Sequence, residues 1–325
     1  MPPAVRRLAS IAALVLGALA LAAPAFADNA GLTPVSPESP NAEAINQTYY
    51  LLLIVTGLVF FAAEGALVVF VVRYRRRRRA VDVEGPQIHG NTRLEVLWTI
   101  VPVFLVAIIV AFVFYKLPDV SDVSRAANEP ANEPNLKIDV RGHQFYWEFR
   151  YPDGSVTYDT MVVPVNRTAV LVVTSQVKDV IHSWWIPALG GKIDAIPGRL
   201  NHTWFRAQRA GVFEGNCAEY CGLNHSRMVM NVHALPAGEF DAELERLSSS
   251  GRAQFEAACA KCHNVSGPQL VGPTLQGNPT LADAVALATL VRNGRNEMPP
   301  VGAGWSDEQI QNLVNYTKTI AGSGQ

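Results

Sequence analysis

Three predominantly hydrophobic runs lie in the first third of this chain, and Glu64 is the single charged residue within them. The first run, residues 11–23, follows Arg6 and Arg7 and precedes the small-residue sequence Ala25-Phe26-Ala27. A basic start, a short apolar run and a small-residue cleavage site are typical of a secretory signal peptide, so we predict one over residues 1–27. A third membrane helix is the alternative, but this run is shorter than the roughly 20 residues that cross a bilayer.

The two longer runs, residues 49–72 and 96–115, are long enough to span a membrane. Between them lies an arginine-rich stretch, residues 73–79, which the positive-inside rule places in the cytoplasm. An arginine run can also bind nucleic acid, but one directly after a membrane helix more often fixes topology, so we expect no nucleic-acid partner. The pattern predicts an exported segment over 28–48 and a transmembrane hairpin over 49–117, with helices at about 49–72 and 95–117.

From residue 118 onward the pattern changes to shorter blocks. Residues 118–135 are polar and rich in proline, which predicts an extended linker. Residues 136–236 contain short β-branched and aromatic runs, such as 168–174 and 227–234, separated by turn sequences. Several short strands at this spacing predict an all-β Greek-key sandwich or barrel.

The last part of the chain changes from a strand pattern to a helix pattern. Residues 237–251 end in three serines and a glycine and predict a second linker, before a small all-α domain over 252–325. We expect its first helix to carry residues 259–263, a second helix at 283–293, and a last one that runs from Ser306 to about residue 320. Ser306 is the predicted N-cap, and Gln309 completes a capping box. The fold class is therefore multidomain: a membrane hairpin, an all-β domain and a small all-α domain.

Charge adds little to this division. The chain is 49 % hydrophobic and 17 % charged, with a formal net charge of −1. In residues 252–325, five basic side chains balance five acidic ones. We do not expect long-range electrostatic attraction to guide this domain to a binding partner. A domain tethered to its partner does not need such attraction, because the tether keeps its effective concentration there high.

The cysteines supply the chemistry, beginning with the sequence C-A-E-Y-C-G-L-N-H-S-R-M at residues 217–228. Sulfur ligands favour Cu(I) and imidazole accepts Cu(II), so this set suits copper that cycles between the two states. A blue-copper site needs one cysteine, whereas Cys217 and Cys221 together can bridge two coppers. A zinc site leaves Met228 without a role, and a disulfide leaves both His225 and Met228 without one; these are the alternatives.

A second motif, C-A-K-C-H at residues 259–263, is the sequence that attaches c-type haem. In such a site Cys259 and Cys262 bond the porphyrin vinyl groups, and His263 is the proximal axial ligand. Gly272-Pro273 is typical of the loop whose carbonyl fixes that imidazole. Met298 is the candidate sixth ligand, which raises the haem potential. The tail resembles a class I cytochrome c, and electron transfer becomes the leading hypothesis.

Three stretches resemble subunit II of haem–copper cytochrome c oxidases: D-V-I-H-S-W at 179–184, K-I-D-A-I-P-G-R-L-N at 192–201, and the cysteine loop. The resemblance implies a cupredoxin-like fold for residues 136–236 and a binuclear copper centre, CuA, bridged by two cysteines. The implied copper ligands are His182, Cys217, the backbone carbonyl of Glu219, Cys221, His225 and Met228. It also implies a magnesium ion at the interface with the catalytic subunit, near the Glu219 carboxylate, with Asp194 as a second candidate.

Two further stretches extend the resemblance. The sequence E-V-L-W-T-I-V-P at 95–102 matches the start of the second helix of that family, in which the glutamate lies at the mouth of a proton pathway. Glu95 is thus a proton-uptake candidate, or a first-turn acid favoured by the helix dipole. The sequence G-H-Q-F-Y-W at 142–147 has Phe145 where the family has the tryptophan that receives an electron from soluble cytochrome c. Tyr146 and Trp147 are then the candidates for the electron route.

The resemblance implies subunit II of a proton-pumping cytochrome c oxidase with a fused cytochrome c, in a bacterial inner (plasma) membrane. The CuA and cytochrome c domains lie on its outer, periplasmic side. The implied partners are subunit I, which carries haem and CuB and reduces oxygen to water, subunit III, and an external cytochrome c or a quinol–cytochrome c reductase as electron donor. We expect no oxygen-reducing site in this chain. The alternatives are a CuA and haem c subunit of another terminal reductase, such as nitric oxide reductase, and a copper or haem delivery protein, against which covalent haem argues.

Overall fold

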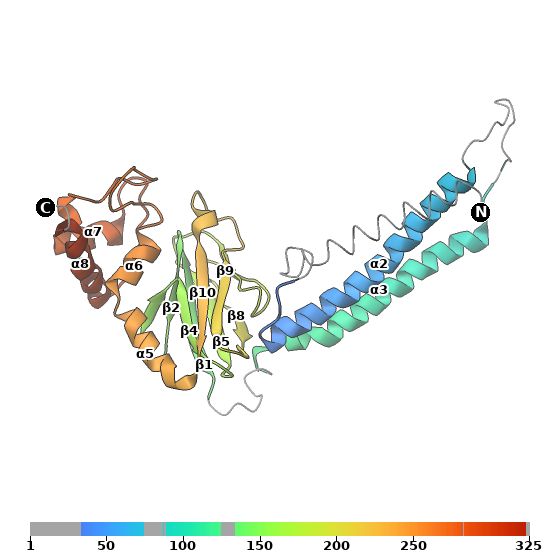
Figure 1. The fold of residues 1–325 in the computed structure, drawn as a ribbon, viewed down its shortest axis with the longest axis horizontal. Helices are drawn as coiled ribbons and strands as arrows, with labels where there is room; N and C mark the ends of the chain where they lie inside the picture. The colour runs from blue at the N-terminus through green and yellow to red at the C-terminus, as the bar shows by residue number, and fades with distance from the viewer. Residues whose placement is uncertain (1–33, 75–86, 88, 125–133, 282, 323–325) are drawn as a thin grey trace, which may run out of the picture.

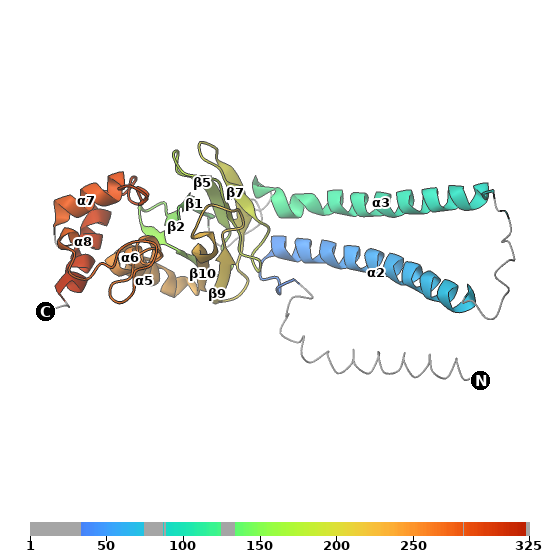
Figure 2. The same cartoon turned by 90° about the horizontal axis from the view of Figure 1, so that it is seen from above.

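The computed structural model describes residues 34–74, 87, 89–124, 134–281 and 283–322. The predicted signal peptide and most of the arginine run, residues 75–79, lie outside them. Three parts follow one another along the long axis of the molecule: a pair of long helices, a group of strands, and a group of short helices (Figures 1 and 2). This order confirms the predicted fold class, with a cupredoxin-like β domain between the membrane hairpin and the α-helical domain.

The long helices are α2 (Pro40–Tyr74) and α3 (Thr92–Ser121), with a mean hydropathy of 2.4 and 2.9 in their most apolar windows. Both are longer than the sequence pattern predicted. Asn91 caps the start of α3, because its side chain accepts hydrogen bonds from the backbone N–H groups of Arg93 and Leu94. At the other end of the hairpin, α2 begins nine residues before the predicted start because its first turns pack against the β domain and bury Ala42 and Ala44.

The contact between α2 and the β domain is hydrogen-bonded as well as packed. Asn41 is buried, and its Nδ2 donates to the carbonyl of Trp204 at 2.7 Å. Just before the helix, the N–H of Glu38 donates to the carbonyl of Ala188 at 2.8 Å. Gly190 packs so closely on the Asn41 side chain that a Cβ there would overlap it. These contacts fix the start of α2 to the β domain.

The β domain contains three sheets among the described residues. The first has the strand order β3-β2-β1-β5-β8, the second β4-β10-β9, and the third pairs β6 with β7. The pairs β1–β5 and β4–β10 are parallel, and the other pairs are antiparallel. The strands are β1 (Leu136–His143), β2 (Tyr146–Arg150), β3 (Val156–Tyr158), β4 (Thr160–Pro164), β5 (Ala169–Ser175), β6 (His182–Trp184), β7 (Ile193–Ala195), β8 (Asn201–Phe205), β9 (Gly211–Asn216) and β10 (Val229–Leu235).

The core of this domain lies between the two larger sheets. Buried residues alternate along β1, at Leu136, Ile138 and Val140, as expected for a strand with one face on a core. The core continues to the two cysteines of the loop between β9 and β10. The hydrophobic cluster of the β domain therefore includes part of the copper loop, residues 217–228.

Most of the predicted linker 237–251 is helical and forms α5 (Ala237–Ser248). Its residues Phe240 and Leu244, one helical turn apart, are buried in the core of the β domain. This packing attaches the segment to the β domain, although the serines and glycine at its end suggested a linker. The chain then enters α6 (Gly251–Ala258) with Ser250 as N-cap, whose Oγ accepts from the N–H of Ala253 at 3.1 Å.

The α-helical domain consists of α6, the short 3-10 helix η3 (Pro279–Leu281), α7 (Ala284–Asn293) and α8 (Asp307–Gly322). The predicted capping box is confirmed: the N–H of Gln309 donates to Ser306 Oγ at 3.2 Å, and the N–H of Ser306 donates to Gln309 Oε1 at 2.7 Å. One detail differs from the prediction. Helix α6 ends at Ala258, with Cys259 as its C-cap, so the C-A-K-C-H motif forms the turn after the helix and not part of it.

Candidate functional site

The copper loop connects β9 to β10 and contains a single 3-10 turn, η2 (His225–Arg227). Two backbone hydrogen bonds fix its first residues: the N–H of Cys217 donates to the carbonyl of Met228 at 2.9 Å, and the N–H of Ala218 donates to the carbonyl of Ser183 at 2.8 Å. The second bond ties the loop to β6, the strand that begins with His182. The fold therefore joins a histidine from one sheet to a loop that begins 35 positions later.

All six predicted copper residues converge here. The Sγ atoms of Cys217 and Cys221 lie 3.9 Å apart, and Cys217 Sγ lies 3.9 Å from His182 Nδ1 and 3.2 Å from the carbonyl oxygen of Glu219. Cys221 Sγ lies 3.6 Å from His225 Nδ1 and 3.7 Å from Met228 Sδ. Each end of the sulfur pair thus faces one imidazole, and each has one weaker donor beside it.

This donor set fits copper better than the alternatives. The separation of 3.9 Å between Cys217 and Cys221 is far beyond the about 2.05 Å of a disulfide. Structural zinc takes four ligands in a closed tetrahedron and has no use for a thioether, yet Met228 is fully buried with its sulfur aimed at Cys221. Two thiols, two imidazoles and a thioether are the soft and borderline ligands that copper takes in both oxidation states. The residues present therefore fit a copper pair.

The two thiols affect each other's ionisation. Their mutual contact lowers the pKa of Cys217 and raises the pKa of Cys221, because a thiolate on one sulfur is stabilised by the thiol proton of the other. The pair consequently loses one proton easily and holds the second one. Binding of metal cations to both sulfurs would replace that remaining proton.

Asp179 also contributes to the copper site, and it was not among the residues predicted from the sequence. Its Oδ1 lies 3.3 Å from His182 Nε2, so the imidazole directs Nδ1 to the sulfur pair and Nε2 to the carboxylate. Asp179 is itself held by the N–H of Val180 at 2.7 Å and that of Gln144 at 3.0 Å. A carboxylate behind a ligating histidine is a common second partner in metal sites, and an aspartate three residues before a candidate histidine is the sequence signal that could have identified it.

One other methionine and one other histidine near the loop make contacts away from the sulfur pair. Met230 is buried in the hydrophobic core and His143 stacks on Tyr146 with ring centroids 4.6 Å apart. The Glu219 side chain is exposed. Asp194 accepts a hydrogen bond from Ser183 Oγ at 2.8 Å, which lowers the pKa of its carboxyl group.

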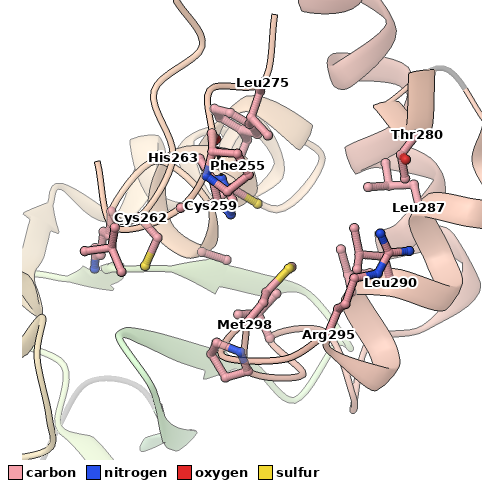
Figure 3. A pocket seen from close by; sticks show the side chains of 18 of the residues that line it. Phe255, Cys259, Cys262, His263, Leu275, Thr280, Leu287, Leu290, Arg295 and Met298 are labelled. Carbon is pink, nitrogen blue, oxygen red and sulfur yellow. Dashed lines mark hydrogen bonds between the residues drawn. The ribbon is translucent and has the colours of Figure 1, made fainter. Parts of the chain in front are cut away.

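A cavity of about 600 Å³ lies in the α-helical domain, and all four predicted haem residues line it. Figure 3 shows Cys259, Cys262 and His263 on the turn after α6, while the sulfur of Met298 points towards the cavity from the facing loop. Apolar side chains from three helices complete the wall, among them Phe255, Leu287 and Leu313. The cavity thus combines an apolar lining with an imidazole, a thioether and two thiols.

The geometry around His263 fits an axial ligand. Its Nδ1 lies 2.8 Å from the carbonyl oxygen of Pro273, so Nδ1 donates there and Nε2 remains available for a metal. A Cβ on Gly272 would overlap the His263 ring, so only glycine allows the imidazole this position. Burial raises the pKa of Cys259 to about 12 and also raises the pKa of Cys262, so both are neutral thiols in the free chain.

The two sites face each other across the segment 142–147, in which Phe145 departs from the family pattern. Gln144 and Phe145 line the haem cavity, and Gln144 Nε2 donates to the carbonyl of Cys221 at 2.6 Å. Trp147 lies edge-on to His182, with ring centroids 6.0 Å apart. Tyr146 is fully buried, and its hydroxyl donates to the carbonyl of Val301 at 2.5 Å. Tyr146 therefore lies in the contact region between the two domains, whereas Trp147 lies in the core of the β domain beside His182.

The membrane residues are placed more simply. Glu95 lies in the first turn of α3, and its Oε1 accepts a hydrogen bond from the N–H of Asn91 at 3.3 Å. The helix-terminus role is thus seen in the structure, and the proton-uptake role stays a prediction. Glu64 lies within α2, away from both candidate sites.

Three known families match parts of the chain. Residues 155–235 match the family described as Cytochrome C oxidase subunit II, periplasmic domain, and residues 27–117 match its transmembrane domain. Residues 247–316 match Cytochrome C oxidase, cbb3-type, subunit III. The matched ranges contain the copper loop, the membrane hairpin and the haem-attachment motif, respectively.

Individual relatives agree with these matches. Cytochrome c oxidase subunit 2 of Alkalihalophilus pseudofirmus is 35% identical over 254 residues, which cover 73% of this chain and 71% of that protein. Cytochrome c oxidase subunit 2 of Bacillus sp. (strain PS3) is 33% identical over 65% of this chain and 64% of its own length. The solved periplasmic domain of subunit II of cytochrome oxidase of Bradyrhizobium japonicum is 37% identical, covers 36% of this chain and 96% of its own, and has a TM-score of 0.33.

Proposed function

The chain belongs to the cytochrome c oxidase subunit II family and carries a C-terminal cytochrome c domain, and from this membership we propose that it conducts single electrons between two sites of its own. Haem c and a copper pair, when bound, supply the one-electron redox chemistry that side chains lack. The observation that carries the proposal is the convergence of both complete ligand sets on one contact region, where Gln144 lines the haem cavity and hydrogen-bonds the carbonyl of Cys221.

In the copper site, Cys217 and Cys221 would hold the metal through their thiolates, and His182 and His225 would each supply an imidazole. The Met228 thioether and the backbone carbonyl of Glu219 would be the weaker donors, and bound copper would supply the one-electron chemistry. Burial of Cys217, Cys221 and Met228 in the hydrophobic core supports the assignment, because a rigid ligand set keeps its geometry in both oxidation states. The exposed carboxylate of Glu219 is free to take part in a magnesium site at the boundary with a partner subunit.

In the haem site, Cys259 and Cys262 would hold the haem through thioether links, and His263 and Met298 would be the ligands of its iron. The Met298 thioether favours a high reduction potential, which suits an electron donor to copper. We propose the domain limits given by the sequence: the hairpin over 49–117, the CuA domain over 136–236 and the cytochrome c domain over 252–325.

The wider assembly follows from family membership. Subunit II belongs to an oxidase complex, so this chain has partner subunits such as subunit I. We propose that haem and CuB in subunit I accept the electrons and reduce oxygen with proton pumping, that subunit III is present, and that a cytochrome c or a quinol–cytochrome c reductase is the external donor. Glu95 is the proposed proton-uptake residue. The inner membrane of a bacterium, with both redox domains on its outer side, is the proposed location.

Metal analysis of the purified full-length chain, combined with a haem stain on a denaturing gel, tests the proposal. We expect two coppers per chain and a haem that stays with the polypeptide after denaturation. Zinc in place of copper, or a single copper that persists in Cys221→Ser, would contradict the binuclear site. Absence of gel-bound haem would contradict the covalent link independently. The intact complex should consume oxygen with reduced cytochrome c.

A further inference from the structure

The turn that carries the haem-attachment motif lies directly against the β domain. Lys261, between the two cysteines of this motif, is only 9 % exposed. Its Nζ donates to the carbonyl of Phe145 at 2.8 Å and forms an ion pair with the carboxylate of Asp159. An ammonium group is costly to bury unless it is paired and hydrogen-bonded. Lys261 can therefore occupy this place only while the two domains are in contact.

Asp159 is held in position by the β domain alone. Its Oδ1 accepts from the N–H of Trp147 at 2.8 Å, and its own N–H donates to the carbonyl of Trp147 at 2.9 Å. Its carbonyl accepts from the N–H of Asn231 at 2.8 Å. The backbone φ of +53° at Asp159 is unusual for a residue other than glycine, and these three bonds stabilise it. The carboxylate is thus a fixed acceptor, set between β2 and β10, for a cation from the other domain.

Two residues of the copper loop hold the same turn from the other side. Arg227 donates to the carbonyl of Lys261 at 2.9 Å, and Asn224 Nδ2 donates to Cys262 Sγ at 3.1 Å. Asn224 directly precedes His225, and Arg227 directly precedes Met228. A rotation of the cytochrome c domain would therefore break contacts made by residues adjacent to two of the proposed copper ligands.

Aromatic packing adds area to this interface and leaves the orientation to the polar contacts. Tyr146 lies 6.3 Å from Trp305 between ring centroids, and Tyr158 lies 5.7 Å from the same ring. The apolar part of these contacts tolerates sliding, because apolar burial has no preferred direction. The hydroxyl groups add directional bonds: Tyr146 donates to the Val301 carbonyl at 2.5 Å, and Tyr158 accepts from Gln309 Nε2 at 2.5 Å. The Lys261 contact is directional, since the ammonium group must reach both the Asp159 carboxylate and the Phe145 carbonyl.

We propose that Lys261 is a positioning residue that locks the cytochrome c domain to the copper domain in a single orientation, through its paired contacts with Asp159 and the Phe145 carbonyl. The inference rests on the proposed function for its purpose, since it keeps the haem cavity against Gln144 and the copper loop. It does not rest on bound cofactors for its geometry, because every contact that forms the lock joins protein atoms. The cytochrome c domain thus stays docked on the copper domain and does not move freely on the segment that links the two.

Amide hydrogen exchange in the full-length chain tests the lock. In Lys261→Met and in Asp159→Asn, which change charge with little change in volume, we expect amides of residues 144–147 and 224–228 to exchange at least about tenfold faster, equal to about 1.4 kcal/mol. The double variant should exchange no faster than the faster single variant, because the two residues act as one pair. Arg252→Gln removes an exposed ion pair with Glu256 in α6 and should leave these amides unchanged.

Exchange within about twofold of the unaltered chain in both single variants would overturn the lock, as would single effects that multiply in the double variant. If Asp159→Asn does not accumulate, Lys261→Met decides, since it leaves the β domain unaltered. Copper and haem content are measured on the same samples. A chain that lacks copper or haem counts against the proposed function, while its exchange data still decide on the lock.

Discussion

Asp179 Oδ1 accepts from His182 Nε2 at 3.3 Å and so turns Nδ1 of the buried imidazole towards the sulfur of Cys217. Burial lowers the pKa of His182, but the hydrogen bonds to Asp179 and Cys217 outweigh it and raise the net pKa. Loss of a carboxylate behind a ligating histidine typically costs 10–100-fold in metal affinity. We expect Asp179→Asn to weaken copper binding by roughly that factor, measured by copper competition with a chelator.

Asp241→Asn is the matched control for this change. It is the same chemical substitution, but Asp241 is exposed on α5, away from the loop. Its copper affinity should equal that of the unaltered chain. Equal affinities in Asp179→Asn and Asp241→Asn would show that the carboxylate does not orient the ligand.

The two buried methionines of the loop region allow a sharp comparison. Met228 and Met230 are both fully buried, but only the Met228 sulfur faces Cys221, at 3.7 Å. Met228→Leu keeps the volume and removes the thioether, so we expect a changed copper absorption and electron paramagnetic resonance spectrum. Met230→Leu changes only core packing, which costs less than about 1.5 kcal/mol, and should leave both spectra as they are. A spectral change in Met230→Leu alone would reverse the assignment.

The candidate ligands could be named from the sequence because metal and haem motifs are local. Cys217, Cys221, His225 and Met228 lie on one short loop, and Cys259, Cys262 and His263 on one turn, so their spacing alone indicates their chemistry. His182 came from a matched stretch of the family, and the structure places it at the sulfur pair. The short β-branched and aromatic runs and the turn sequences between them likewise predicted a β-sandwich, although they did not predict its strand order.

The parts that the sequence did not predict depend on contacts between distant segments. Asp179 and Asp159 are ordinary surface-type residues until the fold brings His182 and Lys261 to them. Helix α5 has a polar composition, and its order comes from the burial of Phe240 in a core formed by other strands. Local pattern carries no information on such partners.

The start of α2 makes a testable contribution to stability. Asn41 is buried, and its Nδ2 donates to the carbonyl of Trp204 at 2.7 Å while its Oδ1 accepts from the N–H of Ala42 at 3.0 Å. Asn41→Ala leaves the buried carbonyl without this partner, at a typical cost of about 1–3 kcal/mol. We expect a lower unfolding temperature of the β domain, measured by thermal scanning of the detergent-solubilised chain. Asn46→Ala, five residues later on the same helix, is the control; equal losses in both variants would contradict a specific role of Asn41.

Gly272 provides a final prediction, which separates haem attachment from iron ligation. A Cβ at this position would overlap the imidazole of His263, whose Nδ1 donates to the carbonyl of Pro273 at 2.8 Å. In Gly272→Ala the ring must shift, whereas the Cys259 and Cys262 thiols keep their access to the cavity. We therefore expect gel-bound haem to persist while the haem absorption spectrum and reduction potential change. Gly304→Ala, where a Cβ meets open space in the same domain, should alter neither. An unaltered potential in Gly272→Ala would mean that His263 does not ligate the iron from the position seen here.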